Sequence, residues 1–491
     1  MRVLAIDQGT SATKAVVVDV DDSGMTLLAD VDVDVPGLRY DGDAVEVDAE
    51  SIWVSIVDAG QVALTETTSG ARAVDCVGIG NQGETVLAWR RSTGEPVTPA
   101  LVWQDRRAVT VTDRLHPWAQ RLQQITGLPL DPYFAAAKFT WLAENLLDAD
   151  ARRDPDVVVT TLDCWVLHRA TGAFVTDAAT ASRTQLLDLD TARWSSEACG
   201  AFGVDSRSLP EVVTCDATIG ETSAFGGSLA VTGLVVDQQA ALFAQNCLVP
   251  GTSKCTYGTG AFLLANLGQT PHRSHNGLAA SIAWQTSDDA VDYCIDGQVF
   301  TVGAAVSWLQ RIGLIEHPAD LDRLGGSVDD DSGAAFVPSL AGVGAPRWVP
   351  EARGSFLGLS LSTQREHLVR AVVVGIAAQV TMLARAMEDD LGTSLTALRV
   401  DGGLTRSSLL MQLQADLLGV PVEVYPYSCA TALGVAALAL RGHVGPGAES
   451  AVIAGWTPER VFEPSMAPTA ADELYGRWLV ALDATIAEAH A

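Results

Sequence analysis

Two short stretches of this chain resemble each other and lie about 250 residues apart. The first, DQGTSATKAVVV, begins at Asp7, and the second, TYGTGAFLLANL, begins at Thr256. Both place a Gly-Thr turn and an alanine before an apolar run of the kind that forms strands. The chain has 491 residues, which is too many for one hydrophobic core. We therefore expect a duplicated fold with a central cleft between its two halves.

The segments around the first stretch alternate between strand and helix patterns. Short, β-branched runs bounded by Gly or Asp predict strands over 3–9, 12–21 and 27–35. Apolar residues then recur with helical spacing over 49–67. Because strands that alternate with helices indicate an α/β fold, we expect two duplicated α/β domains.

The second half shows the same alternation of patterns. Helices are expected over 301–315, 368–391 and 405–419. The second of these segments is long and apolar, but Arg370 and Arg385 interrupt it. We therefore interpret it as a buried helix and not as a membrane span.

The repeat also suggests where the domains divide. We assign an N-terminal domain to 1–235 and a C-terminal domain to 236–450, with the hinge near the run TGLVVDQQA. The last residues, 451–491, contain a helix pattern that is expected to pack back on the core as a tail.

The charge balance argues against two classes of partner. The chain has 31 basic and 60 acidic side chains and a formal net charge of −29. Such an acidic surface repels nucleic-acid backbones and anionic lipid, so we expect no nucleic-acid partner and no membrane insertion. No signal peptide is evident, and the eight cysteines lie mostly in apolar stretches without a C-x-x-C pair. We therefore expect a cytoplasmic protein with reduced thiols.

Two common nucleotide-binding patterns do not fit this chain. No Gly-Lys pair occurs, so a G-x-x-x-x-G-K-[ST] phosphate loop is excluded. Gly78, Gly80 and Gly83 do spell G-x-G-x-x-G, and Asp105 follows about twenty residues later, as in a dinucleotide-binding fold. However, the residues after Gly83 predict a strand, whereas that fingerprint must open a helix. A nicotinamide-dependent dehydrogenase is therefore disfavoured.

Three other glycine turns lie at strand ends and are suited to hold a phosphate. They occupy 9–11, 258–260 and 402–403. Backbone N–H groups and hydroxyls in such turns can cradle a phosphate, although ordinary hairpins use the same residues. Asp7 is a candidate ligand for a Mg²⁺ ion that a nucleotide brings, and Lys14 could neutralise a transferring phosphoryl group. A solvated strand lysine is the alternative for Lys14.

The segment VVDQQAALFAQ carries a candidate general base. Asp237 and Gln238 follow an apolar strand and lead into a helix. A carboxylate in a cleft at such a place can accept the proton of an attacking hydroxyl. The alternative is that Asp237 only caps the helix.

Taken in order, these motifs resemble the FGGY carbohydrate kinase family, which has an actin-like, ribonuclease-H-like fold. The matching segments run from Asp7 almost to the C-terminus and are DQGTSATKAVVVD, VWQDRR, GLPLDPYFAAAKFTWLAEN, TDAATASRTQLLDL, VDQQAALFAQ, TYGTGAF, GVGAPRW, ARGSFLGL and VDGG. The chain is most similar to the glycerol-phosphorylating branch of the family. The resemblance implies ATP- and Mg²⁺-dependent phosphorylation of a hydroxyl, with the nucleotide held between two domains that close over it.

The resemblance also implies a role for each matching residue. The catalytic base matches Asp237. The family's nucleotide contacts match Thr10, Ser11, Lys14, Thr259, Gly303, Ser307, Gly403 and Ser407. The polyol-binding residues match Gly83, Glu84, Trp103, Tyr133, Asp237, Gln238 and Phe262.

Four of these positions depart from the family pattern. Ser307 and Ser407 replace amide side chains, and Lys14 replaces an arginine, which keeps the charge but loses the bidentate fork. Gly83 replaces an arginine that donates to the polyol. Loss of that charged donor is expected to weaken binding by about 1.5–3 kcal/mol unless another group replaces it.

The expected substrate is a small polyol, glycerol first, which would give glycerol 3-phosphate. The space beside Gly83 leaves two alternatives open. A longer polyol such as erythritol, or a ketose such as xylulose or ribulose, could fill the space, or Arg106 or Arg107 could reach into it. A non-catalytic, actin-like nucleotide-binding protein is a further alternative. The resemblance also implies a homodimer or homotetramer.

Overall fold

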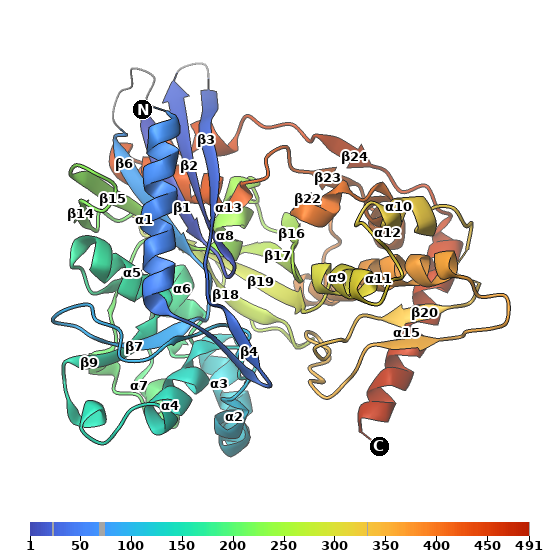
Figure 1. Cartoon of the computed structure of the whole chain (residues 1–491), viewed down its shortest axis with the longest axis horizontal. Helices are drawn as coiled ribbons and strands as arrows, with labels where there is room; N and C mark the ends of the chain where they lie inside the picture. Colours follow the sequence, from blue (N-terminus) through green and yellow to red (C-terminus); the bar gives the residue numbers. More distant parts are fainter. Residues whose placement is uncertain (22–23, 68–73, 331, 491) are drawn as a thin grey trace.

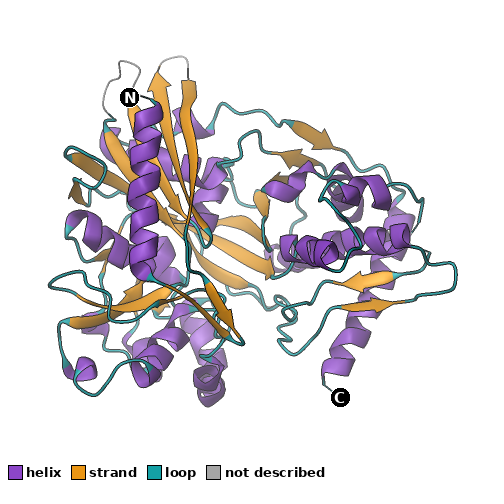
Figure 2. Ribbon diagram, viewed as in Figure 1, coloured by secondary structure: helices purple, strands orange, loops and turns teal. Residues whose placement is uncertain are grey.

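The computed structural model describes residues 1–21, 24–67, 74–330 and 332–490. Two mixed sheets, one from each half of the chain, form the centres of two lobes that lie side by side (Figure 1). Helices pack on both sheets, as expected for an α/β fold (Figure 2).

The N-terminal sheet has six strands in the order β14-β15-β6-β1-β2-β3. These strands are β1 (Arg2–Gln8), β2 (Ala12–Asp21), β3 (Gly24–Asp34), β6 (Cys76–Asn81), β14 (Gly220–Thr222) and β15 (Leu229–Val236). Side chains of β1 alternate between two cores, because successive strand residues point to opposite faces. Leu4 and Ile6 share a core with helix α1 (Ala49–Glu66), whereas Val3 and Ala5 share another with helix α13 (Ala430–Val444). The sheet is therefore covered on both faces.

The C-terminal sheet has seven strands in the order β18-β19-β17-β16-β22-β23-β24. These strands are β16 (Ser253–Tyr257), β17 (Ala261–Gly268), β18 (Ala279–Gln285), β19 (Val291–Val299), β22 (Leu398–Asp401), β23 (Val422–Val424) and β24 (Arg460–Phe462). Helices α11 (Arg365–Leu391) and α12 (Ser408–Leu418) pack on this sheet, and helix α9 (Gly303–Arg311) contributes residues to the same core. Together they enclose the largest core of the molecule.

Five consecutive strands of each sheet share one order and one set of directions. In the first sheet the order is β3-β2-β1-β6-β15, and in the second it is β19-β17-β16-β22-β23. In both, the first two neighbouring pairs are antiparallel and the last two are parallel. The two similar sequence stretches form the hairpins β1–β2 and β16–β17. The duplicated α/β fold expected from the sequence is confirmed.

The long apolar segment of the second half forms α11, which begins three residues earlier than expected. By length and composition it is apolar enough to cross a membrane, but 83% of its most apolar window is buried inside the protein. It contacts β17, β19 and α12, so it is a core helix.

Helix α13 joins the two halves of the sequence. It lies within the segment assigned to the C-terminal domain, yet it packs on β1, β6 and β15 of the N-terminal sheet. Helix α15 (Pro468–Ala489) packs on α11 and α12 of the C-terminal lobe, and the indole N–H of Trp478 donates to the carbonyl of Phe336 at 3.0 Å. The division at residue 235 stays a prediction.

The residues that follow Gly83 belong to a second sheet of the N-terminal lobe. Its five strands are β4 (Arg39–Asp41), β5 (Ala44–Val47), β8 (Ala100–Leu101), β7 (Val86–Arg90) and β9 (Val157–Thr161). The residues after Gly83 thus form strand β7, as predicted, and not the helix of a dinucleotide-binding fingerprint. Asp105 binds the backbone N–H of Val45 at 3.0 Å and the side chain of Arg107 at 2.6 Å, so it holds local structure.

The remaining described helices and strands have eleven residues or fewer. The helices are α2 (Val109–Leu115), α3 (Ala119–Thr126), α4 (Ala135–Asn145), α5 (Leu162–Thr171), α6 (Ala178–Ser182), α7 (Ser196–Phe202), α8 (Asp237–Ala244), α10 (Asp320–Gly325) and α14 (Ser450–Ile453). The strands are β10 (Val175–Asp177), β11 (Leu187–Asp188), β12 (Arg193–Trp194), β13 (Glu211–Val213), β20 (Ala335–Val337) and β21 (Ser355–Leu357).

Candidate active site

Three loops meet at one edge of the N-terminal sheet. Strands β1, β6 and β15 are parallel neighbours, and in their register Asp7 lies opposite Gly80 while Val236 lies opposite Asn81. The hairpin after β1, the segment after β6 and Asp237 after β15 therefore leave the sheet side by side. Ligands of open α/β sheets bind at this carboxyl edge.

A cavity of about 210 Å³ lies where this edge meets the C-terminal lobe. Its walls include both Gly-Thr hairpins and Asp237, although these segments are far apart in the sequence. The residues predicted for the site that line this cavity are Thr10, Ser11, Gly83, Glu84, Trp103, Tyr133, Asp237, Gln238, Thr259 and Phe262. We call this space the small cavity.

The environment of Asp237 suits proton transfer. Burial, followed by the nearby carboxylate of Glu84, raises the pKa of Asp237 to about 6, and Lys254 acts in the opposite direction. Val236 is the N-cap of α8, and the Asp237 side chain accepts from the backbone N–H of the adjacent Gln238 at 2.7 Å. Helix capping therefore does not account for Asp237.

Three aromatic side chains form one wall of the small cavity. The ring of Trp103 meets the rings of Tyr133 and Phe262 edge to face, with both centroid separations at 5.9 Å. The indole N–H of Trp103 donates to the hydroxyl of Thr10 at 2.9 Å, which ties this wall to the first hairpin. An apolar wall beside polar groups is typical of small-molecule sites.

A polar network that the sequence analysis did not predict lies beneath Gln238. The buried ammonium of Lys254 donates to Gln238 Oε1 at 2.7 Å and to Thr256 Oγ1 at 2.9 Å. Thr256 in turn donates to Asp401 Oδ1 at 2.6 Å. Lys254 thus fixes the side chain beside Asp237. The only sequence signal was its rarity, since Lys254 is one of three lysines.

Glu84 has an uncommon backbone conformation. Its φ is 56°, in the left-handed region that favours glycine. Such strain is found at ligand sites, where the surrounding structure holds it in place. The carboxylate of Glu84 accepts from Nε of Arg183 at 2.6 Å, and both side chains line the small cavity.

Asp7 and Lys14 lie opposite each other in the first hairpin. Burial and the nearby Asp237 raise the pKa of Asp7 to about 7. The ammonium of Lys14 binds Asp30 at 2.7 Å and Asp32 at 2.9 Å, and Lys14 lines neither cavity described here. Its role in phosphoryl transfer stays a prediction.

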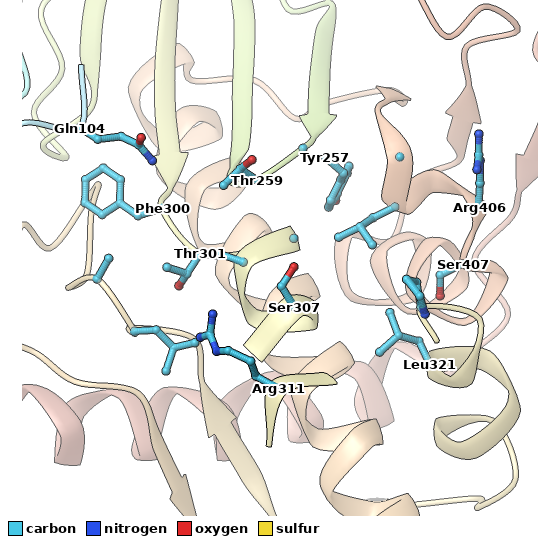
Figure 3. Close-up of a pocket in the computed structure, with 18 of the residues that line it drawn as sticks. Gln104, Tyr257, Thr259, Phe300, Thr301, Ser307, Arg311, Leu321, Arg406 and Ser407 are labelled. Carbon is cyan, nitrogen blue, oxygen red and sulfur yellow. The ribbon is translucent and has the colours of Figure 1, made fainter. Parts of the chain in front are cut away.

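A second, larger cavity of about 1090 Å³, some of whose lining residues are drawn in Figure 3, adjoins the small one. Thr259, Trp103 and Tyr133 line both cavities, so the two spaces share a wall. The residues predicted to contact nucleotide that line the larger cavity are Thr259, Gly303, Ser307, Gly403 and Ser407. The structure thus gathers the predicted polyol residues around one space and most of the nucleotide residues around the next.

Three arginines that line the larger cavity add positive charge to an acidic protein. They are Arg106, Arg311 and Arg406, of which Figure 3 labels the last two. Within the described residues, none of their side chains makes a hydrogen bond or an ion pair. Three guanidinium groups that form no ion pair among the described residues favour an anionic ligand such as a polyphosphate.

Gly402 explains why the third turn needs glycine. Its φ is 97°, and a Cβ atom there would lie 2.4 Å from the carbonyl oxygen of Tyr257. The turn therefore packs closely on the end of β16, where the second hairpin begins. By contrast, a Cβ atom at Gly403 would meet nothing within 4 Å.

An arginine, Arg106 or Arg107, is one of the two alternatives for the space beside Gly83, and neither of them lines the small cavity. Arg107 binds Glu46 at 2.7 Å and Asp105 at 2.6 Å, whereas Arg106 lines the larger cavity. A Cβ atom at Gly83 would meet only Val236, at 3.1 Å.

Comparisons with known proteins cover nearly the whole chain. Residues 2–244 match the N-terminal domain of the FGGY family of carbohydrate kinases, and residues 253–443 match the C-terminal domain. The glycerol kinase of Myxococcus xanthus is 39% identical over 98% of each chain. The glycerol kinase of Thermus brockianus is 40% identical over 98% of this chain and 97% of its own. The structure of Plasmodium falciparum glycerol kinase with ADP superposes with a TM-score of 0.90 at 29% identity, covering 99% of this chain and 98% of that one.

Proposed function

This chain belongs to the FGGY family of carbohydrate kinases, and we propose that it transfers the terminal phosphoryl group of ATP to a hydroxyl of glycerol. The product is glycerol 3-phosphate. The similarity to glycerol kinases over nearly the full length of the chain supports this substrate over the other sugars and polyols that the family's fold could serve.

One observation supports the proposal most directly. Asp237 lines the same small cavity as the hairpin turns 9–11 and 258–260, and that cavity adjoins the larger one with three arginines. A nucleotide in the larger cavity would point its terminal phosphate toward the shared wall at Thr259. The acceptor hydroxyl would then lie between that phosphate and Asp237, as in-line transfer requires.

The side chains of the small cavity have complementary tasks. The carbon chain of glycerol packs on the wall formed by Trp103, Tyr133 and Phe262, while the carboxylate of Glu84 accepts from a hydroxyl. Asp237 accepts the proton of the attacking hydroxyl. A pKa of about 6 leaves Asp237 mainly ionised at neutral pH and keeps it close to the basicity that general-base catalysis favours.

Mg²⁺ fits the donor set at the end of β1. Mg²⁺ usually binds one or two carboxylates together with substrate phosphates and water. Within the described residues there is no group of three metal-ligating side chains, so the ion would come with the nucleotide and Asp7 would be its protein ligand. When bound, Mg²⁺ neutralises charge on the phosphate oxygens. A cation would also relieve the repulsion that raises the pKa of Asp7.

The cysteines support a cytoplasmic site of action. All eight are buried and none forms a disulfide in the structure. Free thiols are typical of reducing compartments. We also propose that the protein assembles as a homodimer or homotetramer, as the family resemblance implies.

Purified protein tests the function through product identity. Incubation with Mg-ATP and glycerol should release ADP and yield a phosphomonoester that phosphorus NMR identifies as glycerol 3-phosphate. Erythritol, xylulose and ribulose belong in the same panel because Gly83 leaves space beside the substrate. A clear preference for one of these over glycerol would replace the substrate assignment. ATP binding without phosphorylation of any polyol or ketose would favour a non-catalytic protein.

A further inference from the structure

Arg183 joins the two lobes inside the small cavity. It follows α6 in the N-terminal lobe, and its Nη1 donates to Asp296 of β19 in the C-terminal sheet at 2.5 Å. Its Nε donates to Glu84 of the N-terminal lobe at 2.6 Å. All three residues are 5% exposed. The guanidinium group is therefore held rigidly between two carboxylates of different lobes.

The held guanidinium keeps donors available to a ligand. An arginine has five N–H donors in a fixed fork, and two carboxylate bonds use only part of them. Within the described residues, Nη2 of Arg183 makes no hydrogen bond. Arg183, Glu84 and Asp296 all line the cavity that also contains Asp237.

Two aromatic rings lie close to the guanidinium group. Its central carbon lies 5.9 Å from the centroid of the Tyr133 ring and 5.3 Å from that of Phe134. Although burial opposes the charge, Asp296 and Glu84 raise the pKa of Arg183 well above its usual value. The donor is thus permanently charged, and its bonds to Glu84 and Asp296 hold it in the cavity.

Among the described residues, no other cationic side chain lines the small cavity. Position 83, where the family resemblance implies an arginine, is glycine, and neither Arg106 nor Arg107 lines this cavity. Lys254 uses its ammonium on Gln238 and Thr256. Among the described residues that line the small cavity, Arg183 is the one with a positive charge.

We propose that Arg183 binds a hydroxyl of the substrate directly and supplies the charged hydrogen-bond donor that position 83 lacks in this chain. The inference rests on the proposed function. Glu84 and Asp296 hold the guanidinium, and its remaining N–H groups select a substrate that presents a hydroxyl acceptor there.

The first test pairs an enzyme variant with a substrate that lacks one hydroxyl. Glycerol is compared with 1,2-propanediol and 1,3-propanediol, in wild-type enzyme and in Arg183→Lys. The wild-type enzyme should favour glycerol over the diol that lacks the contacted hydroxyl by about tenfold to a hundredfold in kcat/KM. In Arg183→Lys that preference should fall to within about threefold, because lysine lacks the Nη2 group that would donate to the hydroxyl.

A merely structural role predicts a different pattern. If Arg183 only holds Glu84 in place, the effects of the variant and of the missing hydroxyl multiply, and the preference for glycerol stays unchanged. That outcome overturns the inference. Arg107→Lys is the matched control, since Arg107 also pairs with two carboxylates but lines neither cavity. It should leave the preference unchanged.

A second variant keeps the inference testable if Arg183→Lys does not fold. Gly83→Arg adds a guanidinium where the backbone φ allows a side chain and only Val236 lies near. If Arg183 already provides the donor, this variant changes the KM for glycerol by less than about threefold. A decrease of tenfold or more would show that the cavity lacked a donor and would contradict the inference. No phosphorylation of any polyol by wild-type enzyme would contradict the proposed function itself.

Discussion

The carboxyl group of Asp237 raises the pKa of Asp7, although 229 residues separate the two in the sequence. Asp7 is the second-to-last residue of β1 and Asp237 directly follows β15, and these two strands flank β6 in the N-terminal sheet. Burial contributes most to the raised pKa of Asp7, so this edge of the sheet brings two acidic groups together in a partly buried place. In the proposed function, Asp237 is the general base and Asp7 is the protein ligand of Mg²⁺.

The pH dependence of turnover should report the pKa of Asp237. A general base works only when ionised, and burial together with Glu84 raises this pKa to about 6. We expect kcat/KM to fall about tenfold per pH unit below pH 6 and to be level between pH 7 and 8. Initial rates at saturating Mg-ATP check this. A profile that stays level down to pH 4.5 would show that no group with a raised pKa limits the reaction.

Asp237→Asn should increase the stability of the folded protein at neutral pH. The pKa of Asp237 is higher in the folded protein than in the unfolded chain, so the folded protein binds this proton more tightly. Ionised Asp237 therefore destabilises the folded state. This destabilisation grows as the pH rises from about 4 to about 6 and is constant above pH 6. Replacing Asp237 with a neutral amide should stabilise the protein by about 1–3 kcal/mol at pH 8 and by less at pH 5. Urea unfolding at both pH values measures the difference. If the variant gains the same unfolding free energy at pH 5 and at pH 8, Asp237 does not become ionised with a raised pKa in the folded protein.

Lys254→Met should affect both stability and the pH profile. It leaves Thr256, Gln238 and nearby carboxylates without their buried cation, which we expect to cost about 3 kcal/mol of unfolding free energy. Because Lys254 lowers the pKa of Asp237, its loss should also move the acid limb of the rate profile to higher pH. Lys254→Arg keeps the charge and should shift the limb less. A limb that moves to lower pH in the methionine variant would exclude this coupling.

Gly402→Ala and Gly403→Ala should separate folding from nucleotide binding. At Gly402 the positive φ and the contact with the carbonyl of Tyr257 predict a loss of about 2 kcal/mol or more. At Gly403 the space is open, so stability should change by less than about 1 kcal/mol while the KM for ATP rises. Thermal unfolding and ATP titrations of both variants check this. If both variants lose the same unfolding free energy, the close contact at Gly402 and the open space at Gly403 are wrong.

Features that depend on strand ends could be predicted from the sequence. The hairpins at 9–11 and 258–260 and the residue Asp237 each follow an apolar strand pattern, and parallel strands place such ends together. The family resemblance added the residue roles. A helix could be predicted for α11 because its long apolar run contains no proline and no turn signal.

Contacts between distant segments could not be predicted in this way. Arg183 lies 99 positions from Glu84 and 113 from Asp296, and no local pattern joins these three residues. The pairing of Lys14 with Asp30 depends on the register of β2 and β3, which the sequence leaves open. The packing of α13 on the N-terminal sheet likewise depends on long-range topology.

The central claim is that Asp237 takes the proton of the acceptor hydroxyl, and Asp237→Asn tests it most directly. ADP release with glycerol and Mg-ATP is measured on the wild-type protein and the variant, and ATP affinity is measured by calorimetry on the same samples. We predict that turnover falls by about 10²–10⁴-fold or more while the dissociation constant for ATP stays within about threefold. Turnover within about tenfold of wild type in a folded variant that binds ATP would contradict the account.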